Sequence, residues 1–108
     1  VACGGGDSSS DATVPADADL VVRALDGIRW DAESYTAPAG EITVVFENAS
    51  SLPHNLHFVD ADGVQLPTVL DLPRRGEIAV DMTIEAGTYT LICTIPGHGN
   101  MTATLTVD

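Results

Sequence analysis

The chain has 108 residues, of which 44% are hydrophobic, and 16 acidic residues against four arginines give it a net charge of −12 at pH 7. This length fits one domain with one core, and the hydrophobic content disfavours a disordered chain. So acidic a surface repels phosphate backbones, which excludes nucleic-acid binding, and no apolar run approaches the roughly 20 residues that a membrane-spanning helix needs.

Residues 1–19 are predicted to be a polar tether rather than part of the fold. They are rich in Gly, Ser, Ala and Asp and carry no apolar period, as is typical of flexible linkers. Val1-Ala2-Cys3 also resembles the end of a lipobox, the bacterial lipoprotein signal in which small residues precede a cysteine that becomes lipidated. The resemblance implies a membrane anchor on Cys3 and a place outside the cytoplasm, in the periplasm or on the outer face of the cell membrane. The alternative is that Cys3 is only the edge of a signal region.

From residue 20 onward, short apolar runs alternate with Gly, Pro, Asn and Asp, and helix signals are almost absent. This pattern is typical of a β-sandwich or barrel. Residues 64–76, with two prolines and a glycine, are expected to be irregular. We therefore predict one all-β domain over residues 20–108, a Greek-key sandwich or barrel of roughly seven to eight strands with mostly antiparallel neighbours. The expected strands are, in chain order, Leu20–Leu25, Ile28–Trp30, Glu33–Thr36, Glu41–Asn48, Asn55–Val59, Glu77–Ile84, Thr88–Cys93 and Thr102–Val107.

Three potential metal ligands lie close together near the end of the chain. Cys93 ends an expected strand, and His98 and Met101 follow it across a segment with a proline and two glycines, residue types that force a tight loop. Such a loop can turn a thiolate, an imidazole and a thioether toward one point. This set of soft and borderline ligands suits copper, especially Cu(I). Zinc fits the same nitrogen and sulfur ligands, but the thioether favours copper.

The strand alternation indicates which further histidine could complete the set. If Leu56 and Phe58 face the core, His54 faces the same way and His57 faces outward, because alternate side chains share one face of a strand. Two imidazoles and one thiolate in a trigonal arrangement, with a long axial Met, form the electron-transfer copper centre. His54 is therefore the candidate ligand, and His57 is expected to be a solvated surface residue.

With these residues in place, the chain resembles the cupredoxins, the blue copper proteins of the plastocyanin, azurin and amicyanin type. The matching pieces cover nearly the whole folded part and include Tyr35–Thr43, Pro53–Asn55, Gly87–Cys93, Pro96–His98 and Met101. The resemblance implies the cupredoxin sandwich and one type 1 copper ion, with Met101 as the axial ligand and, as equatorial ligands, His54, Cys93 and His98. The loop departs from any single member, because its step from Cys to His looks azurin-like and its step from His to Met looks amicyanin-like.

The resemblance also implies a link between the two ligand-bearing segments. In the family, an Asn that follows the first histidine ligand bridges them by hydrogen bonds. Asn55 occupies that position, and Thr94 lies in the segment that it would bond. Such bonds orient the ligands and tune the metal.

The function implied by the resemblance is that of a membrane-tethered carrier of single electrons between redox partners outside the cytoplasm, and not of an enzyme. The acidic balance predicts a partner with a basic docking surface and an attraction that weakens with salt, and we expect the carrier to be a monomer. Two alternatives remain open: a copper-binding or delivery protein, and a metal-free scaffold sandwich. A multicopper oxidase is excluded because it needs further histidine clusters, and the chain has three histidines.

Overall fold

The computed structural model of the chain describes residues 18–95, 97–98 and 101–108, so Cys3 and most of the predicted tether lie outside the described residues. No helix in this part of the chain is long and apolar enough to span a membrane. The described residues form nine strands: β2 (Leu20–Leu25), β3 (Arg29–Trp30), β4 (Ser34–Ala37), β5 (Gly40–Asn48), β6 (His54–Val59), β7 (Gln65–Leu72), β8 (Gly76–Ile84), β9 (Gly87–Ile92) and β10 (Thr102–Val107).

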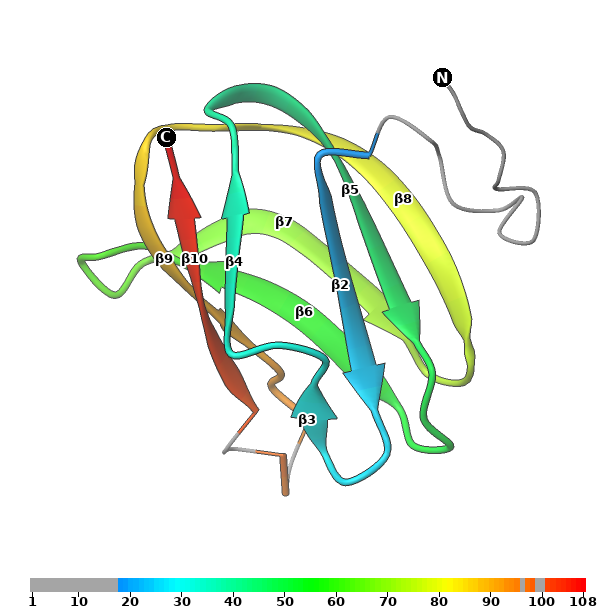
Figure 1. Ribbon diagram of the computed structural model, residues 1–108. Helices are drawn as coiled ribbons and strands as arrows, with labels where there is room; N and C mark the ends of the chain where they lie inside the picture. The colour runs from blue at the N-terminus through cyan, green and yellow to red at the C-terminus, as the bar shows by residue number, and fades with distance from the viewer. Residues whose placement is uncertain (1–17, 96, 99–100) are drawn as a thin grey trace.

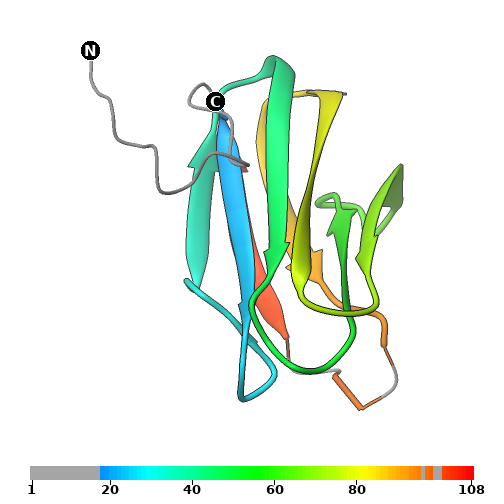
Figure 2. The same cartoon turned by 90° about the vertical axis from the view of Figure 1, so that its right-hand side faces the viewer.

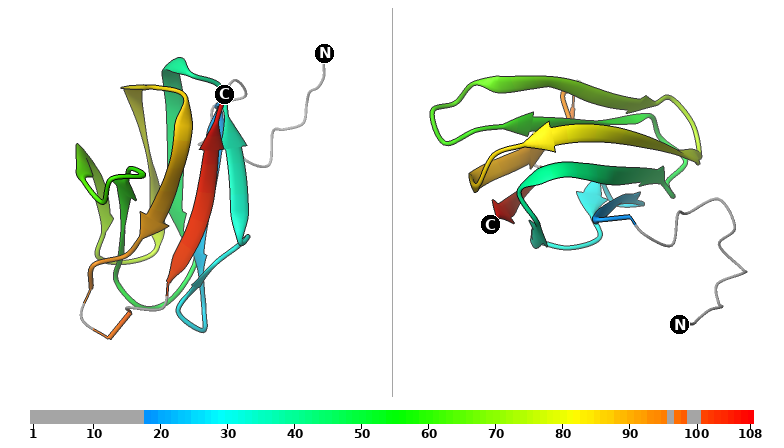
Figure 3. Two further views of the ribbon diagram at one scale, coloured as in Figure 1. Left: turned by 90° about the vertical axis from the view of Figure 1, so that its left-hand side faces the viewer. Right: turned by 90° about the horizontal axis from the view of Figure 1, so that it is seen from above.

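The strands form two sheets that pack face to face, as Figures 1, 2 and 3 show. One sheet has the strand order β4-β10-β9-β6-β7, and the other has the order β3-β2-β5-β8. Neighbouring strands are antiparallel except for β4 with β10 and β2 with β5, which run parallel. The predicted all-β sandwich is confirmed, and the described residues hold nine strands, more than the sequence predicts.

The core between the sheets is the one that the strand alternation predicts. Burial alternates residue by residue along β6, where Leu56 and Phe58 are fully buried, and β5 buries Ile42 and Phe46 on one face. The Trp30 ring packs edge-on against Phe46, with ring centroids 6.1 Å apart. Burying one large apolar side chain contributes roughly 1.5–3 kcal/mol, so these contacts are the main source of the stability of the sandwich.

Strand β7 is the largest correction to the sequence prediction, because it occupies residues that were expected to be irregular. β7 lies at the edge of its sheet beside β6, and an edge strand tolerates the missing N–H of Pro67. The pairing register between the two strands also shifts between His57 and Val59, and such irregularities are a second place where proline is accepted. Proline in this segment therefore marks a sheet edge and not a loop.

Several connections meet at one end of the sandwich, toward the lower side of Figure 1. The connection 49–53, which leads into β6, is held there on both sides. The Ser51 N–H donates to Asp26 Oδ1 at 3.2 Å, and the Arg75 guanidinium donates to the Ala49 carbonyl at 2.8 Å. These bonds fix the segment just before His54, so we call this end of the molecule the His54 end.

The hydroxyl of Tyr35 on β4 donates a hydrogen bond to Asp31 Oδ1. Burial of the phenol, followed by its bond to Asp31 and the charge of that carboxylate, raises the pKa of Tyr35 well above its usual value of 10.0. The folded chain therefore holds the phenol neutral more firmly than the unfolded chain does. This contribution to stability is present below about pH 10 and is lost as the pH rises above that value.

We therefore expect the free energy of unfolding to fall above about pH 10, and to fall less steeply in the variant Tyr35→Phe, which has no phenol to ionise. Denaturant titrations of both proteins at a series of alkaline pH values measure the two slopes. Equal slopes in the two proteins would contradict the stabilising role of the neutral phenol.

Candidate metal centre

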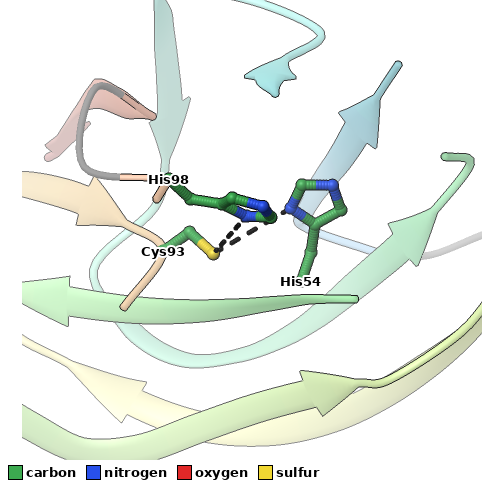
Figure 4. A group of neighbouring side chains, drawn as sticks. All are labelled: His54, Cys93 and His98. Carbon is green, nitrogen blue, oxygen red and sulfur yellow. Dashed lines mark hydrogen bonds between the residues drawn. The ribbon is translucent and has the colours of Figure 1, made fainter. Parts of the chain in front are cut away.

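Strand pairing brings His54 and Cys93 together. Strands β6 and β9 are antiparallel neighbours with His57 opposite Ile92, and His54 begins β6 whereas Cys93 directly follows β9. The two side chains therefore leave adjacent strands at the same end of the sheet, and Figure 4 shows that they point toward one another. His54 is buried, as the alternation along β6 predicts, and His57 is half-buried on the opposite face of the strand.

A tight loop after β9 turns His98 back toward Cys93 (Figure 4). The His98 N–H donates to the Ile95 carbonyl, and the Met101 N–H donates to the His98 carbonyl, both at 3.0 Å. Gly97 has a φ of 90°, a left-handed conformation in which other residues are strained. Glycine at position 97 therefore allows the backbone turn that brings His98 to the cluster.

The three candidate ligand atoms lie at distances that suit one ion. Cys93 Sγ is 3.6 Å from His98 Nδ1 and 3.9 Å from His54 Nδ1, and the three atoms lie within 4.8 Å of one another. An ion with nitrogen bonds of about 2.0 Å and a sulfur bond of about 2.3 Å, at trigonal angles, would hold sulfur and nitrogen roughly 3.7 Å apart. Both sulfur–nitrogen distances therefore fit a single metal ion.

The side chains of the cluster are buried, and their donor atoms are available to a metal. His54 is 0% exposed and His98 is 6% exposed, and Cys93 carries a buried free thiol. Burial lowers the pKa of His54 below its usual value, and the neighbouring His98, with its ring centroid 4.7 Å away, lowers the pKa further. His54 is therefore neutral near pH 7 and offers a nitrogen lone pair. Two imidazoles and a thiol favour a borderline or soft ion such as copper.

Asn55 links the two ligand-bearing segments, as the resemblance implies. Its Oδ1 accepts the Thr94 N–H at 2.8 Å, and its Nδ2 donates to Thr94 Oγ1 at 2.9 Å. Thr94 Oγ1 is in turn 3.2 Å from His57 Nε2, and His57 Nδ1 is 2.9 Å from Gln65 Oε1. His57 thus lies on the outward face, as the sequence predicts, and is also part of a polar chain that runs from β7 to the residue after Cys93.

A second polar chain leads to His54, and the sequence does not point to it. Ser50 Oγ lies 2.9 Å from His54 Nε2, and the Ser50 N–H donates to Asn48 Oδ1 at 3.0 Å. Asn48 Nδ2 donates to the carbonyls of Leu52 at 2.8 Å and Leu72 at 3.1 Å. Ser and Asn are common turn residues, so their presence between two strands carries no signal for a metal site. Only the fold shows that both side chains are buried.

Met101, the predicted axial ligand, is buried at the start of the segment that enters β10, and is 1% exposed. The hydrogen bond from its backbone N–H to the His98 carbonyl keeps Met101 next to the loop that carries the candidate ligand His98. A thioether in this position suits copper, and the axial role of Met101 stays a prediction.

No protein-family model and no curated protein matches the chain, but solved structures do. An auracyanin from the photosynthetic bacterium Roseiflexus castenholzii is 25% identical, with a TM-score of 0.70 over 82% of this chain and 95% of that chain. Auracyanin A, a "blue" copper protein from the green thermophilic photosynthetic bacterium Chloroflexus aurantiacus, is 24% identical, with a TM-score of 0.70 over 82% of this chain and 96% of that chain. A Cu(I) structure of an amicyanin mutant is 25% identical, with a TM-score of 0.66 over 90% of this chain and 88% of that chain.

These three neighbours are cupredoxins, and the matches span nearly the whole of their chains. The two packed sheets agree with that fold, and the three donors lie at the start of β6, directly after β9 and in the loop that follows β9. The chain therefore has the cupredoxin fold, and its cluster of His54, Cys93 and His98 fits one type 1 copper ion.

Proposed function

We propose that the protein is a type 1 copper protein that carries single electrons between redox protein partners, and that it is not an enzyme. The observation that carries the proposal is the convergence of a thiol and two imidazole nitrogens within 4.8 Å, in the buried interior of a cupredoxin sandwich. Auracyanin A is a blue copper protein, and amicyanin has been solved with Cu(I). Copper is therefore the ion that we assign to this cluster.

When bound, a copper ion supplies a one-electron couple between Cu(II) and Cu(I). The role of the protein is to hold the donor atoms in nearly the same geometry in both oxidation states, so that little rearrangement accompanies the change of charge. His54 and Cys93 lie at the ends of paired strands, and the bonds between Asn55 and Thr94 tie those strands together beyond the last ladder pair. Fixed dipoles in a site that excludes water need little reorganisation.

We assign Met101 as the axial ligand and His98 as the ligand through which partners exchange electrons. A weak axial donor tunes the reduction potential, and Met101 is the buried thioether beside the ligand loop. His98 is 6% exposed whereas His54 is 0% exposed, so His98 is the imidazole nearer the surface. Leu52, 42% exposed, offers an apolar contact in the connection that precedes His54. A small contact of this kind supports the weak, brief docking of redox encounters.

We propose that the partner has a basic surface. The net charge of −12 attracts cations over long distances at low salt. Asp60, Asp62 and Glu85 border one hollow at the ends of β6 and β9 farthest from the cluster. The His54 end carries Arg74 and Arg75 in the connection between β7 and β8, together with the carboxylate of Asp26. The acidic residues far from the cluster would therefore orient an approaching partner through the field of the whole protein.

Small redox complexes can measure the sign of this field. We expect a cationic cobalt(III) phenanthroline complex to oxidise the reduced, copper-loaded protein more slowly as salt is added. Anionic hexacyanoferrate(III) should oxidise it faster, because salt screens attraction and repulsion alike. Replacing Asp60, Asp62 and Glu85 with the corresponding amides should flatten both trends, as measured by stopped-flow absorbance. Trends of the opposite sign would show that the arginines govern approach, and a basic partner would then be wrong.

We further propose that the protein works outside the cytoplasm as a monomer, attached to the membrane by a lipid on Cys3. The support is the sequence Val1-Ala2-Cys3 and the polar composition of the residues that follow. Mass spectrometry of protein taken from its native membrane should find acyl chains on Cys3, and Cys3→Ala should move the protein to the soluble fraction. An unmodified Cys3 in the membrane-bound protein would contradict the anchor.

Addition of Cu(II) to the pure metal-free protein tests the central proposal. We expect an intense visible thiolate-to-copper band, a reversible one-electron wave in voltammetry and slow loss of copper to a chelator. A protein that binds copper, gives no reversible wave and releases the ion readily would be a delivery protein. A protein that stays colourless and binds no copper would be a scaffold sandwich. Either result would reject the electron-carrier function.

A further inference from the structure

The buried polar residues of the described part of the chain gather around the metal cluster. They are Asn48, Ser50, His54 and His98. Burying a polar side chain is costly unless its hydrogen bonds are satisfied. Two of the four are candidate ligands, whereas Asn48 and Ser50 lie just before His54 and belong to no ligand set. Both side chains are buried at the end of the molecule that holds the cluster, and hydrogen bonds connect them to His54.

The hydroxyl of Ser50 makes three close contacts, and their directions can be worked out. Ser50 Oγ lies 2.9 Å from His54 Nε2, 3.0 Å from the Leu52 nitrogen and 3.2 Å from the Leu52 carbonyl oxygen. A hydroxyl has one proton to donate and two lone pairs that accept. The Leu52 N–H can only donate and the Leu52 carbonyl can only accept. All three contacts are satisfied together when Ser50 donates a hydrogen bond to that carbonyl and accepts one from the Leu52 N–H and one from a protonated His54 Nε2.

This assignment determines which nitrogen of His54 is free to bind a metal. A neutral imidazole carries its proton on one nitrogen and a lone pair on the other. With the proton on Nε2, the lone pair is on Nδ1, and Nδ1 is the atom that lies 3.9 Å from Cys93 Sγ. The contact with Ser50 and the contact with the cluster thus require the same tautomer of the ring.

We propose that Ser50 is a positioning residue that holds His54 in its metal-binding tautomer and ring orientation before the ion arrives. This inference rests on the proposed function, since it supposes that the cluster binds copper. A hydrogen bond from a ligating histidine to a second group fixes the tautomer and raises the basicity of the ligand. In this chain that group is the side chain of a serine four residues before the ligand.

Asn48 holds Ser50 in place, which makes the arrangement rigid. Asn48 Oδ1 accepts the Ser50 N–H at 3.0 Å, and Asn48 Nδ2 donates to the Leu52 and Leu72 carbonyls. Leu72 on β7 is the residue paired with His54 in the sheet. The serine is therefore fixed both to its own connection and to the strand beside the ligand, and metal binding need not order it.

The variant Ser50→Ala removes the hydroxyl but keeps the backbone N–H that bonds Asn48. We expect its copper affinity, measured by competition with a chelator, to fall 10–100-fold, the range found when such outer partners of metal ligands are removed. We also expect its reduction potential to rise, because an imidazole that has lost its acceptor is a weaker donor and stabilises Cu(II) less. In the metal-free variant, nitrogen NMR of the ring should show His54 exchanging between its two tautomers.

Two comparisons keep the test decisive. Ser51→Ala is the matched control, because Ser51 is exposed and bonds Asp26 through its backbone N–H. This variant should keep the copper affinity, the reduction potential and the His54 tautomer of the parent protein. Nitrogen NMR of the metal-free parent protein requires no variant and should find the proton on His54 Nε2. A proton on Nδ1, or a Ser50→Ala variant with unchanged affinity and tautomer, would overturn the proposal while leaving copper binding intact. Failure of the parent protein to bind copper would instead reject the proposed function.

Discussion

Replacing Cys93 with serine should abolish the intense visible absorption of the copper-loaded protein. The band arises from charge transfer between a thiolate and copper, and Cys93 Sγ is the sulfur that lies 3.6 Å and 3.9 Å from the two imidazoles. A serine hydroxyl is a hard oxygen donor that binds Cu(I) poorly, so the reversible one-electron wave should be lost as well. Serine has nearly the volume of cysteine, so the fold should survive. Absorption spectra recorded after addition of Cu(II), with far-ultraviolet circular dichroism for the fold, measure both effects.

Two further variants show whether the loss is specific to the cluster. His57→Ala removes an imidazole three residues from His54 but on the opposite face of β6, so the band should remain. Met101→Leu should also keep the band, because a long axial bond contributes little to it. The reduction potential should rise in this variant, since removal of a donor disfavours Cu(II). A band that persists in Cys93→Ser, or disappears in His57→Ala, would overturn the assigned ligand set.

Replacing Phe46 with alanine should lower the free energy of unfolding by about 3–5 kcal/mol, the cost of emptying a buried phenylalanine site. Phe46 is 0% exposed in the middle of the sandwich and packs edge-on against Trp30. Domains of this size are stable by roughly 5–15 kcal/mol, so the loss is a large part of the total. Trp30 is the only tryptophan of the chain, and its fluorescence during denaturant unfolding reports directly on the damaged region.

The variant Val69→Ala provides the comparison for Phe46→Ala. Val69 lies on the edge strand β7 and is 47% exposed, so its truncation leaves no cavity. We expect a loss of less than about 1 kcal/mol, within the range of strand propensity and surface effects. Equal losses in the two variants would mean that the contact between Phe46 and Trp30 is not central to the stability of the domain.

The strands and the inward direction of His54 follow from the sequence because alternation is a local property. Leu20–Leu25 and Thr102–Val107 are predicted with the bounds that the structure has, since turn residues flank each apolar run. The strand over Gln65–Leu72 could not be predicted in the same way. Whether Pro67 breaks a strand or sits on an edge depends on which strands pair beside it, and that pairing involves residues distant in sequence.

In the metal cluster, too, the local features could be predicted from the sequence and the long-range ones could not. Cys93 and His98 share one short loop, so their spacing predicts that both can reach one point. The tautomer of His54 is set by the 49–53 connection, whose course depends on bonds from Asn48 to β7 and from Arg75 to Ala49. Bonds between segments that meet only after folding leave no pattern along the chain, so Ser50 could not be identified from the sequence.

The chain enters the sandwich on the side away from the His54 end. Leu20 at the start of β2 pairs with Val44, whereas Ala24 near its end pairs with Asn48, beside the connection that leads to His54. Figure 1 shows that β2 runs toward the His54 end. With a lipid on Cys3, the link to the bilayer would attach at the pole opposite the ligands. A flexible tether at that pole would leave the cluster free to turn toward the open aqueous compartment, where a diffusing protein could reach His98 without having to displace lipid.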